Sequence, residues 1–267
     1  MVLYYSFRKI LSVRGRVFRF QSKNLNKKFK NQAYILNYLN QFTVDELSDQ
    51  HIKYNSVNEF EHQVGRFLNM NLIAKDIEST GRIREEFSIV EFGTYKGLGL
   101  LLLEKAFRRL NFDNSITYVG IDAFVGLPIS SSNWRKGQFS DVTYDECLTN
   151  LINNIPHKIK IKLINDSFIN LSNNDTFHQI SNILIFHFDA DLGKSTMEAL
   201  EISGAYLLKA KPKLPFYFLF DDWGYHPNEV PDAFHDWLQN FKKLNNINIT
   251  KISSTKLTRY YRVELIS

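Results

Sequence analysis

Between about residues 87 and 241, short apolar runs alternate with longer stretches in which apolar residues recur every third or fourth position. The short runs are typical of strands buried on both faces, and the longer stretches are typical of amphipathic helices. The predicted strands are residues 88–92, 117–122, 158–164, 183–189 and 215–221. The predicted helices are residues 97–110, 143–155, 195–209 and 230–241. This alternation predicts an α/β domain with a doubly wound, mostly parallel sheet.

The pattern changes on either side of this region. Residues 31–80 are helical in pattern, with capping-box spacing at Ser56 and Glu59. The apolar face that follows consists of Val57, Phe60, Val64, Phe67 and Leu68. Residues 247–253 and 258–266 have strand character and predict an antiparallel hairpin that closes the sheet. We therefore divide the chain into an N-terminal helical extension, residues 1–55, and an α/β domain, residues 56–267.

Two of the predicted helices carry further capping boxes, Thr143 with Glu146 and Ser195 with Glu198. The chain has 267 residues, of which 44% are hydrophobic, so it can bury one large core. Its single cysteine, Cys147, excludes an internal disulfide and is expected to be a buried helix residue. We find no apolar stretch long enough to span a membrane and no export signal, so we expect a cytoplasmic protein.

The net charge of +5 is unevenly distributed along the chain. Residues 1–31 hold nine Lys or Arg and no acid, whereas the rest of the chain holds 24 basic and 28 acidic residues. Leu3, Phe7, Ile10 and Leu11 keep helical spacing within this basic tail. The interpretation that we favour is a solvated arm or a helix packed on a partner subunit. Peripheral contact with an anionic membrane is the second choice, and nucleic acid or an organelle signal the third.

Acidic residues stand where two of the predicted strands end. Asp189 follows one apolar run, and Asp221 and Asp222 follow another. If these strands are neighbours, their ends lie only about 5 Å apart. Three carboxylates gathered there would repel one another unless a cation lay between them, and oxygen ligands suit Mg²⁺. The sequence therefore predicts a magnesium site formed by Asp189, Asp221 and Asp222.

The turn after the first predicted strand contains Glu91, Gly93 and Gly97. Such a turn lets a ligand approach the backbone closely, and the helix start beyond it favours negative charge. Its spacing differs from G-x-G-x-x-G, which disfavours an NAD-type oxidoreductase and suits a nucleoside cofactor without a pyrophosphate. Asp122 at the second strand end is placed to accept hydrogen bonds from ribose hydroxyls, and Asp166 with Ser167 lies near the expected adenine.

The ordered segments EFGTYKG, GIDAFVGLP, WRKGQFS, NDSF, FDADLGKST and FDDW, within residues 85–240, resemble the macrocin O-methyltransferase family. Members of that family methylate sugar hydroxyls of antibiotics and related glycosides with S-adenosylmethionine. The resemblance implies a Rossmann-like class I methyltransferase with a seven-stranded sheet, Mg²⁺ and methyl transfer to oxygen. The cofactor-binding residues that it implies are Glu91, Gly93, Thr94, Tyr95, Gly97, Asp122, Ala123, Phe124, Asp166, Ser167 and Asp189. Gly193 and Lys194 depart from the family pattern, in which an aromatic residue and an acid follow DADL.

Asp189 is the candidate general base as well as a metal ligand, and His226 competes with it for the role of base. His187 is expected to be a core histidine. Residues 129–140, with Trp134 and Phe139, are expected to form a ligand loop beyond a strand end. The predicted acceptor is a hydroxylated small molecule, and a homo-oligomer is expected. The alternatives are a methyltransferase acting on nucleic acid or protein and a non-catalytic binding protein.

Overall fold

The computed structural model of the protein describes residues 57–81, 85–110, 112, 116–131, 134–156, 159–210, 215–224, 229–255 and 257–266. The chain divides into two units, residues 1–64 and residues 65–267. Of the first unit, the described part is the beginning of helix α5 (Val57–Ser79). The predicted extension of residues 1–55 and the Ser56 capping box lie outside the described residues, so both stay predictions. The second unit contains the sheet.

Seven strands form one sheet in the order β3-β2-β1-β4-β5-β7-β6. Their bounds are β1 (Phe87–Phe92), β2 (Ile116–Asp122), β3 (Lys160–Asn165), β4 (Ile183–Phe188), β5 (Phe216–Phe220), β6 (Ile247–Ser254) and β7 (Arg259–Leu265). The strands β1 to β5 pair in parallel, and β7 runs antiparallel between β5 and β6. The predicted doubly wound seven-stranded sheet and its closing hairpin are confirmed. The strand order reverses at β1 and β4, where such sheets bind ligands beyond their carboxyl ends.

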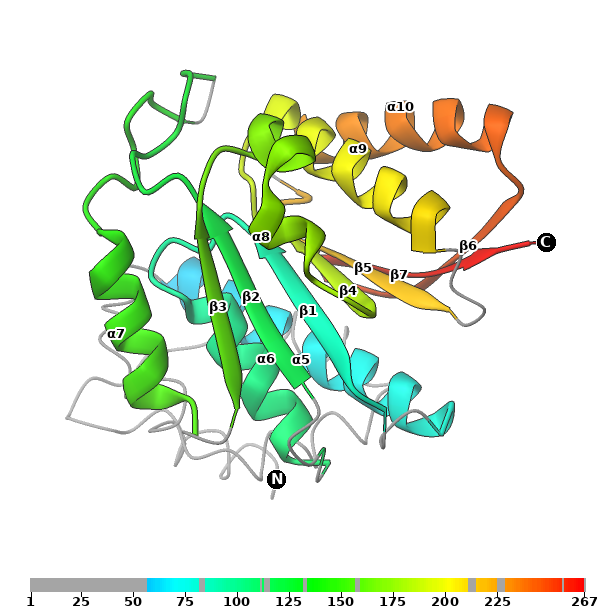
Figure 1. The fold of residues 1–267 in the computed structure, drawn as a ribbon, viewed down its shortest axis with the longest axis horizontal. Coiled ribbons are helices and arrows are strands. Elements are labelled where there is room, and N and C mark those ends of the chain that lie inside the picture. Colours follow the sequence, from blue (N-terminus) through cyan, green and yellow to red (C-terminus); the bar gives the residue numbers. More distant parts are fainter. Residues whose placement is uncertain are drawn as a thin grey trace. The chain divides into compact units, whose positions relative to one another are not determined.

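Helices cover both faces of the sheet (Figure 1). The part of α5 beyond residue 64, α6 (Leu98–Arg108) and α7 (Tyr144–Asn154) lie on one face. The other face carries the 3₁₀ helix η3 (Phe168–Asn173), α8 (Asp175–His178), α9 (Gly193–Ala210) and α10 (Glu229–Leu244). Because both faces are covered, all residues of β1, β4 and β5 are buried, which explains their continuous apolar runs.

Aromatic side chains fill the core beneath the strand ends. The rings of Phe188 and Phe220 stack with centroids 4.6 Å apart, and Phe92 stacks on Phe188 at 5.5 Å. Cys147 is buried in α7, as expected. Of the predicted apolar face of the first helix, Phe67 and Leu68 are buried, and the other side chains lie outside those described. Within the described part of the chain, no helix combines the length and apolar character that a membrane crossing needs.

Two details between the strands differ from expectation. The Thr143 capping box is confirmed, but the Ser195 box is wrong, because α9 begins at Gly193 and Ser195 lies inside the helix. The reason is tertiary: the Gly193 backbone N–H donates to the Glu229 carboxylate of α10 at 2.9 Å, so the helix start is satisfied from another element. The sequence pattern also missed η3 and α8. Asn174 lies between them and caps the start of α8, where its side-chain oxygen accepts from the Phe177 N–H.

Candidate functional site

The carboxyl ends of β1, β4 and β5 meet at one edge of the sheet. Phe92 pairs with Phe188, and Phe188 pairs with Phe220, so Asp189 and Asp221 each follow paired positions. The backbone N–H of Asp189 donates to the Phe92 carbonyl and that of Asp221 to the Phe188 carbonyl, both at 2.9 Å. The structure thus brings together the acidic ends of two segments that are separate in the sequence, as predicted.

An arginine lies between these two carboxylates. Arg66 of α5 places Nη2 2.5 Å from Asp189 Oδ2 and Nη1 3.0 Å from Asp221 Oδ2. Sequence reasoning missed this residue, although a signal was present. Arg66 shares one helical face with the fully buried Met70, Ile73 and Ile77, and an arginine on an apolar stripe needs a buried acidic partner.

Beneath Asp189 lie two more ionisable groups, Glu91 and His187, both 0% exposed. His187 Nδ1 is 2.9 Å from Glu91 Oε1, and Arg66 Nη2 is 3.6 Å from the same oxygen. Burial lowers the pKa of His187 to about 3, so the ring is neutral. Burial raises the pKa of Glu91 to about 8, against the opposing charge of Arg66. The core location predicted for His187 is confirmed, and any contact of the buried Glu91 carboxyl with a cofactor would be indirect.

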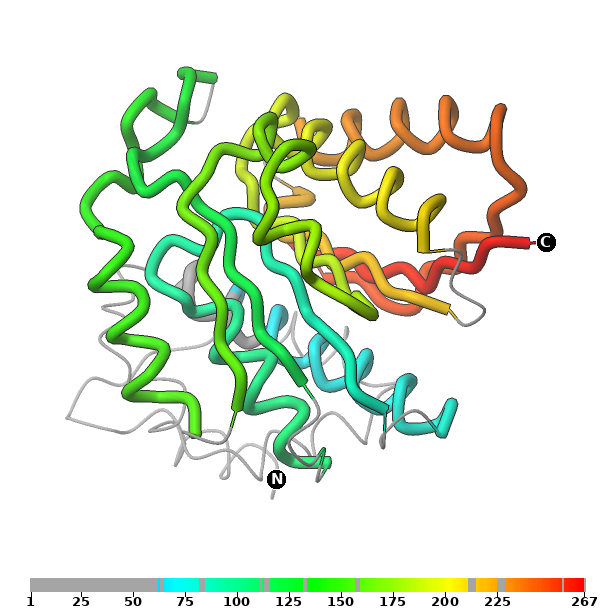
Figure 2. The backbone as a smooth tube through the Cα atoms, viewed as in Figure 1, coloured from blue at the N-terminus to red at the C-terminus, as the bar shows by residue number. Residues whose placement is uncertain are grey.

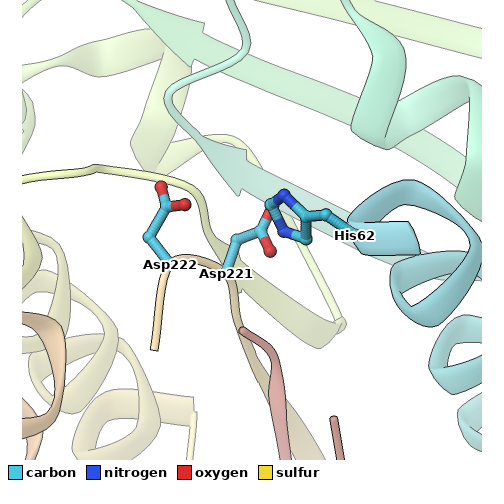
Figure 3. Close-up of side chains that lie close together, drawn as sticks. All are labelled: His62, Asp221 and Asp222. Carbon is cyan, nitrogen blue, oxygen red and sulfur yellow. The ribbon is translucent and has the colours of Figure 1, made fainter. Parts of the chain in front are cut away.

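Asp222 offers a carboxylate oxygen within 4.8 Å of one from Asp221, and it also has a second acidic neighbour. Figure 3 shows their carboxyl groups pointing in different directions from the end of β5. The Asp222 side chain forms a hydrogen bond with that of Asp191, which the sequence analysis did not select although it belongs to the DADL segment. Burial raises the pKa of Asp191 to about 8 and holds that of Asp222 well above its usual range. The carboxylates of Asp191, Asp221 and Asp189 act on the pKa of Asp222 in the same direction as burial.

The three predicted magnesium ligands do not form one compact group, although Asp221 and Asp222 offer oxygens within 4.8 Å of each other. Among the described residues, Asp189, Asp221 and Asp222 are not a group whose ligand atoms all lie within 4.8 Å of one another. Asp189 and Asp221 have the Arg66 guanidinium between them, and Asp222 is hydrogen-bonded to Asp191. A divalent ion between Asp189 and Asp221 does not fit this arrangement.

The turn after β1 requires glycine at its closest approach to β4. Gly93 has φ 87°, and a Cβ added there would lie 2.0 Å from the Asp189 carbonyl oxygen. Gly97 has φ 84° and precedes α6. Thr94 is buried, and Tyr95 adopts a positive φ of 48°, which is uncommon for a residue with a side chain. Strained backbone of this kind often marks a functional turn.

Asp122 joins this turn to the end of β2. Its Oδ2 accepts from the Tyr95 N–H and its Oδ1 from the Phe124 N–H, both at 2.8 Å. Burial raises the pKa of Asp122, while these hydrogen bonds act in the opposite direction. Asp122 therefore organises the backbone of residues 93–97 and of Ala123 and Phe124. Its predicted contact with ribose hydroxyls stays a prediction.

Asp166 and Ser167 follow β3 at the same edge of the sheet. Asp166 accepts hydrogen bonds from the Ser167 N–H at 2.8 Å and from the side-chain amides of Asn170 and Asn174 at 2.9 and 3.0 Å. These donors lower the pKa of Asp166 and order the start of η3. The predicted adenine contact of Asp166 and Ser167 stays a prediction. His226, the competing base, lies outside the described residues.

The long loop after β2 extends beyond the carboxyl end of the strands (Figure 2). Its attachment to the β1 turn runs through Tyr95, whose hydroxyl donates to Asp141 at 2.6 Å and whose ring lies 5.2 Å from that of Phe139. Trp134 lies 5.6 Å from Phe139. The predicted ligand loop thus presents aromatic side chains beside the glycine turn.

Several solved structures with a similar fold are methyltransferases. The O-methyltransferase NovP aligns with a TM-score of 0.54 at 17% identity, over 74% of this chain and 79% of its own. The Podospora anserina methyltransferase PaMTH1, solved with SAH bound, has a TM-score of 0.55 at 11% identity, over 95% and 100%. The calicheamicin methyltransferase CalS11 has 0.51 at 14% identity, over 94% and 96%.

No model of a known protein family matches the chain, and no curated protein sequence matches it either. At identities this low, the structural likeness shows the fold alone. The chain therefore has a Rossmann-like methyltransferase fold, and the resemblance to the macrocin family in particular stays a prediction.

Proposed function

We propose that the chain is an S-adenosylmethionine-dependent O-methyltransferase that acts on a hydroxyl of a small molecule. The observation that carries this proposal is the meeting of the glycine turn with an acidic strand end: the Gly93 backbone lies against the Asp189 carbonyl. A cofactor bound along the turn would thus have its methyl group near a carboxylate. The fold that the chain shares with NovP, PaMTH1 and CalS11 supports the proposal.

For methyl transfer to a hydroxyl, the protein mainly has to position the acceptor and the methyl donor and to supply a base. Bound S-adenosylmethionine would supply a methyl group on a positively charged sulfur, and its transfer would form a C–O bond to the acceptor as the C–S bond breaks and a neutral thioether leaves. The hydroxyl proton has to leave because a protonated alcohol is a weak nucleophile. Asp189 is our candidate to receive it, since its side chain is 22% exposed whereas that of Asp221 is 1% exposed.

The electrostatics of Asp189 suit that role. Burial raises its pKa to about 6 despite the attraction of Arg66, so the group is ionised at neutral pH yet more basic than an ordinary aspartate. His226 is the competing base. Magnesium assistance, which the sequence predicts, has no step in this mechanism, because the place between Asp189 and Asp221 is taken by Arg66.

We further propose a sugar or glycoside hydroxyl as the acceptor. CalS11 is a TDP-rhamnose 3'-O-methyltransferase, and the motif resemblance to the macrocin family also points to a sugar acceptor. The aromatic side chains of Trp134 and Phe139 offer apolar faces on which a ring could stack beside the site. No observation on the described residues favours action on nucleic acid or protein.

The test of the proposal is cofactor binding by titration calorimetry on the full chain. We expect S-adenosylmethionine and S-adenosylhomocysteine to bind. We expect Asp122→Ala to weaken both about tenfold or more, because it removes a charged hydrogen-bond acceptor that also orders the turn. Asp236→Asn on the exposed side of α10 is the matched control and should bind as the unmodified chain does. A chain that binds neither compound is not this kind of enzyme.

A further inference from the structure

We propose that Arg66 is the resident cation of the Asp189–Asp221 pair and a positioning residue for Asp189. The guanidinium takes the place for which the sequence predicts a divalent ion. The inference concerns the same site as the proposed function and rests on it, but its test does not depend on methyl transfer.

The geometry matches a guanidinium and excludes a second cation from the same place. The two terminal nitrogens of Arg66 serve two different carboxylates, at 2.5 Å on Asp189 and 3.0 Å on Asp221. The planar fork of an arginine can hold two carboxylates at a set separation, which a lysine cannot do. The two facing oxygens are therefore already engaged by donors.

The buried Arg66 side chain keeps both its positive charge and its position between the carboxylates. Arg66 is 4% exposed, and a guanidinium cannot lose its charge by deprotonation. If a metal ion displaced it, this buried positive charge would lose its two closest carboxylate partners and would stand beside the incoming positive charge, which is costly. Arg66 is thus expected to keep its carboxylates rather than yield them to a metal ion.

Polar contacts hold the arginine's helix in place. Asn69, one turn after Arg66, donates through Nδ2 to Thr258 Oγ1 at 2.6 Å and accepts from Ser253 Oγ at 2.6 Å. Further along α5, Asp76 accepts from the Tyr217 hydroxyl of β5 at 2.6 Å. These bonds tie α5 to the part of the sheet that carries Asp221, so the separation between Arg66 and the carboxylates is set by the fold.

Asp221 and Asp189 therefore have different roles in the site. Asp221 is 1% exposed and serves to hold Arg66, and Arg66 in turn holds Asp189 at the exposed rim. Asp221 is then not a metal ligand. The Asp189 carboxylate has its orientation from the protein itself and needs no metal ion for it.

Manganese(II) is the probe for this inference, titrated into the full chain and followed by electron paramagnetic resonance. We expect Asp221→Asn to leave Mn²⁺ affinity unchanged. We expect Arg66→Gln to bind Mn²⁺ about tenfold more tightly or better, since it removes the guanidinium that lies between the two carboxylates. Adding Asp221→Asn to Arg66→Gln should abolish that gain, and Arg66→Lys, which keeps the charge, should show less of it.

Two results would overturn the inference. One is an Mn²⁺ affinity of Asp221→Asn that is about tenfold or more below that of the wild-type chain, since Asp221 would then be a ligand. The other is a folded Arg66→Gln variant without any gain. Should Arg66→Gln fail to fold, the comparison of the wild-type chain with Asp221→Asn decides alone. Calorimetry with S-adenosylmethionine on the same proteins reports separately whether the proposed function holds.

Discussion

Asp189 shows how neighbours can set the chemistry of a single side chain. Burial and the nearby Asp221 raise its pKa, and Arg66 opposes them, with a net value of about 6. The opposing influences leave a carboxylate that is ionised at neutral pH and still able to accept a proton. Glu91 and Asp221, which are fully or almost fully buried, cannot reach an acceptor in the same way.

Replacing Asp189 should therefore separate binding from transfer. We expect Asp189→Asn to keep S-adenosylmethionine affinity and to lose methyl transfer by a factor of about 10² to 10⁴, the usual value of a general base. In the unmodified chain the rate should rise with pH through about 6, because the base must be deprotonated. The measurement is S-adenosylhomocysteine formation across a panel of glycosides, with Asp236→Asn as control. Unchanged turnover in Asp189→Asn would remove Asp189 from the mechanism.

At the scale of elements, the site depends on how closely the β1 turn approaches β4. Gly93 is the point of contact, because it combines a positive φ with a neighbouring carbonyl oxygen where a side chain would be. The Asp122 carboxylate then holds the following residues through the Tyr95 N–H. The turn, β2 and β4 therefore form one unit that a cofactor would contact.

Gly93 has both a positive φ and a carbonyl oxygen close to where a side chain would begin. A comparison with Gly81 separates the effects of these two features. Gly93→Ala introduces a Cβ 2.0 Å from the Asp189 carbonyl oxygen at φ 87°, whereas Gly81→Ala has a similar φ of 77° and no atom within 4 Å. We expect Gly81→Ala to lower the free energy of unfolding by about 1 kcal/mol through backbone strain alone. Gly93→Ala should cost clearly more and abolish cofactor binding. Urea unfolding and calorimetry measure both effects, and equal losses would show that the close contact is unimportant.

At the scale of the whole molecule, the buried ionisable groups link folding to pH. Glu91 has its folded pKa raised from 4.5 to about 8, so its contribution to stability is present below 4.5 and is lost as the pH rises toward 8. His187 has its folded pKa lowered from 6.5 to about 3, so its contribution is present above 6.5 and is lost as the pH falls toward 3. The two groups act on opposite sides of neutrality.

Glu91→Gln should remove one of these two dependences. Between pH 4.5 and 8 we expect the variant to lose only the share of the fall in unfolding free energy that arises from Glu91, at most about 1.4 kcal/mol per pH unit for one proton, whereas the shares of Asp189 and Asp191 persist. The acid-side loss that arises from His187 should persist in the same variant and serves as the internal control. Urea unfolding at a series of pH values measures both. An unchanged slope above pH 4.5 would show that Glu91 is ionised in the folded chain.

Much of the fold followed from local pattern. The largely apolar runs of β1, β4 and β5 predicted buried parallel strands, because strands covered on both faces consist mostly of apolar residues. The juxtaposition of Asp189 with Asp221 followed from the same reasoning, since adjacent parallel strands end at one edge. The basic tail of residues 1–31, with its possible membrane contact, and the expected homo-oligomer stay predictions.

Other parts of the site were decided by the tertiary structure. Arg66 is 123 positions from Asp189 in the chain, and no local spacing says which acid a buried arginine will contact. Asp191 and Asp222 interact beyond two different strand ends, and both adopt positive φ values, of 57° and 54°. Periodicity along the chain determined which faces are buried and where the strands end. The partner of each buried charge was set by packing between distant elements, because electrostatic pairing depends on separation in space.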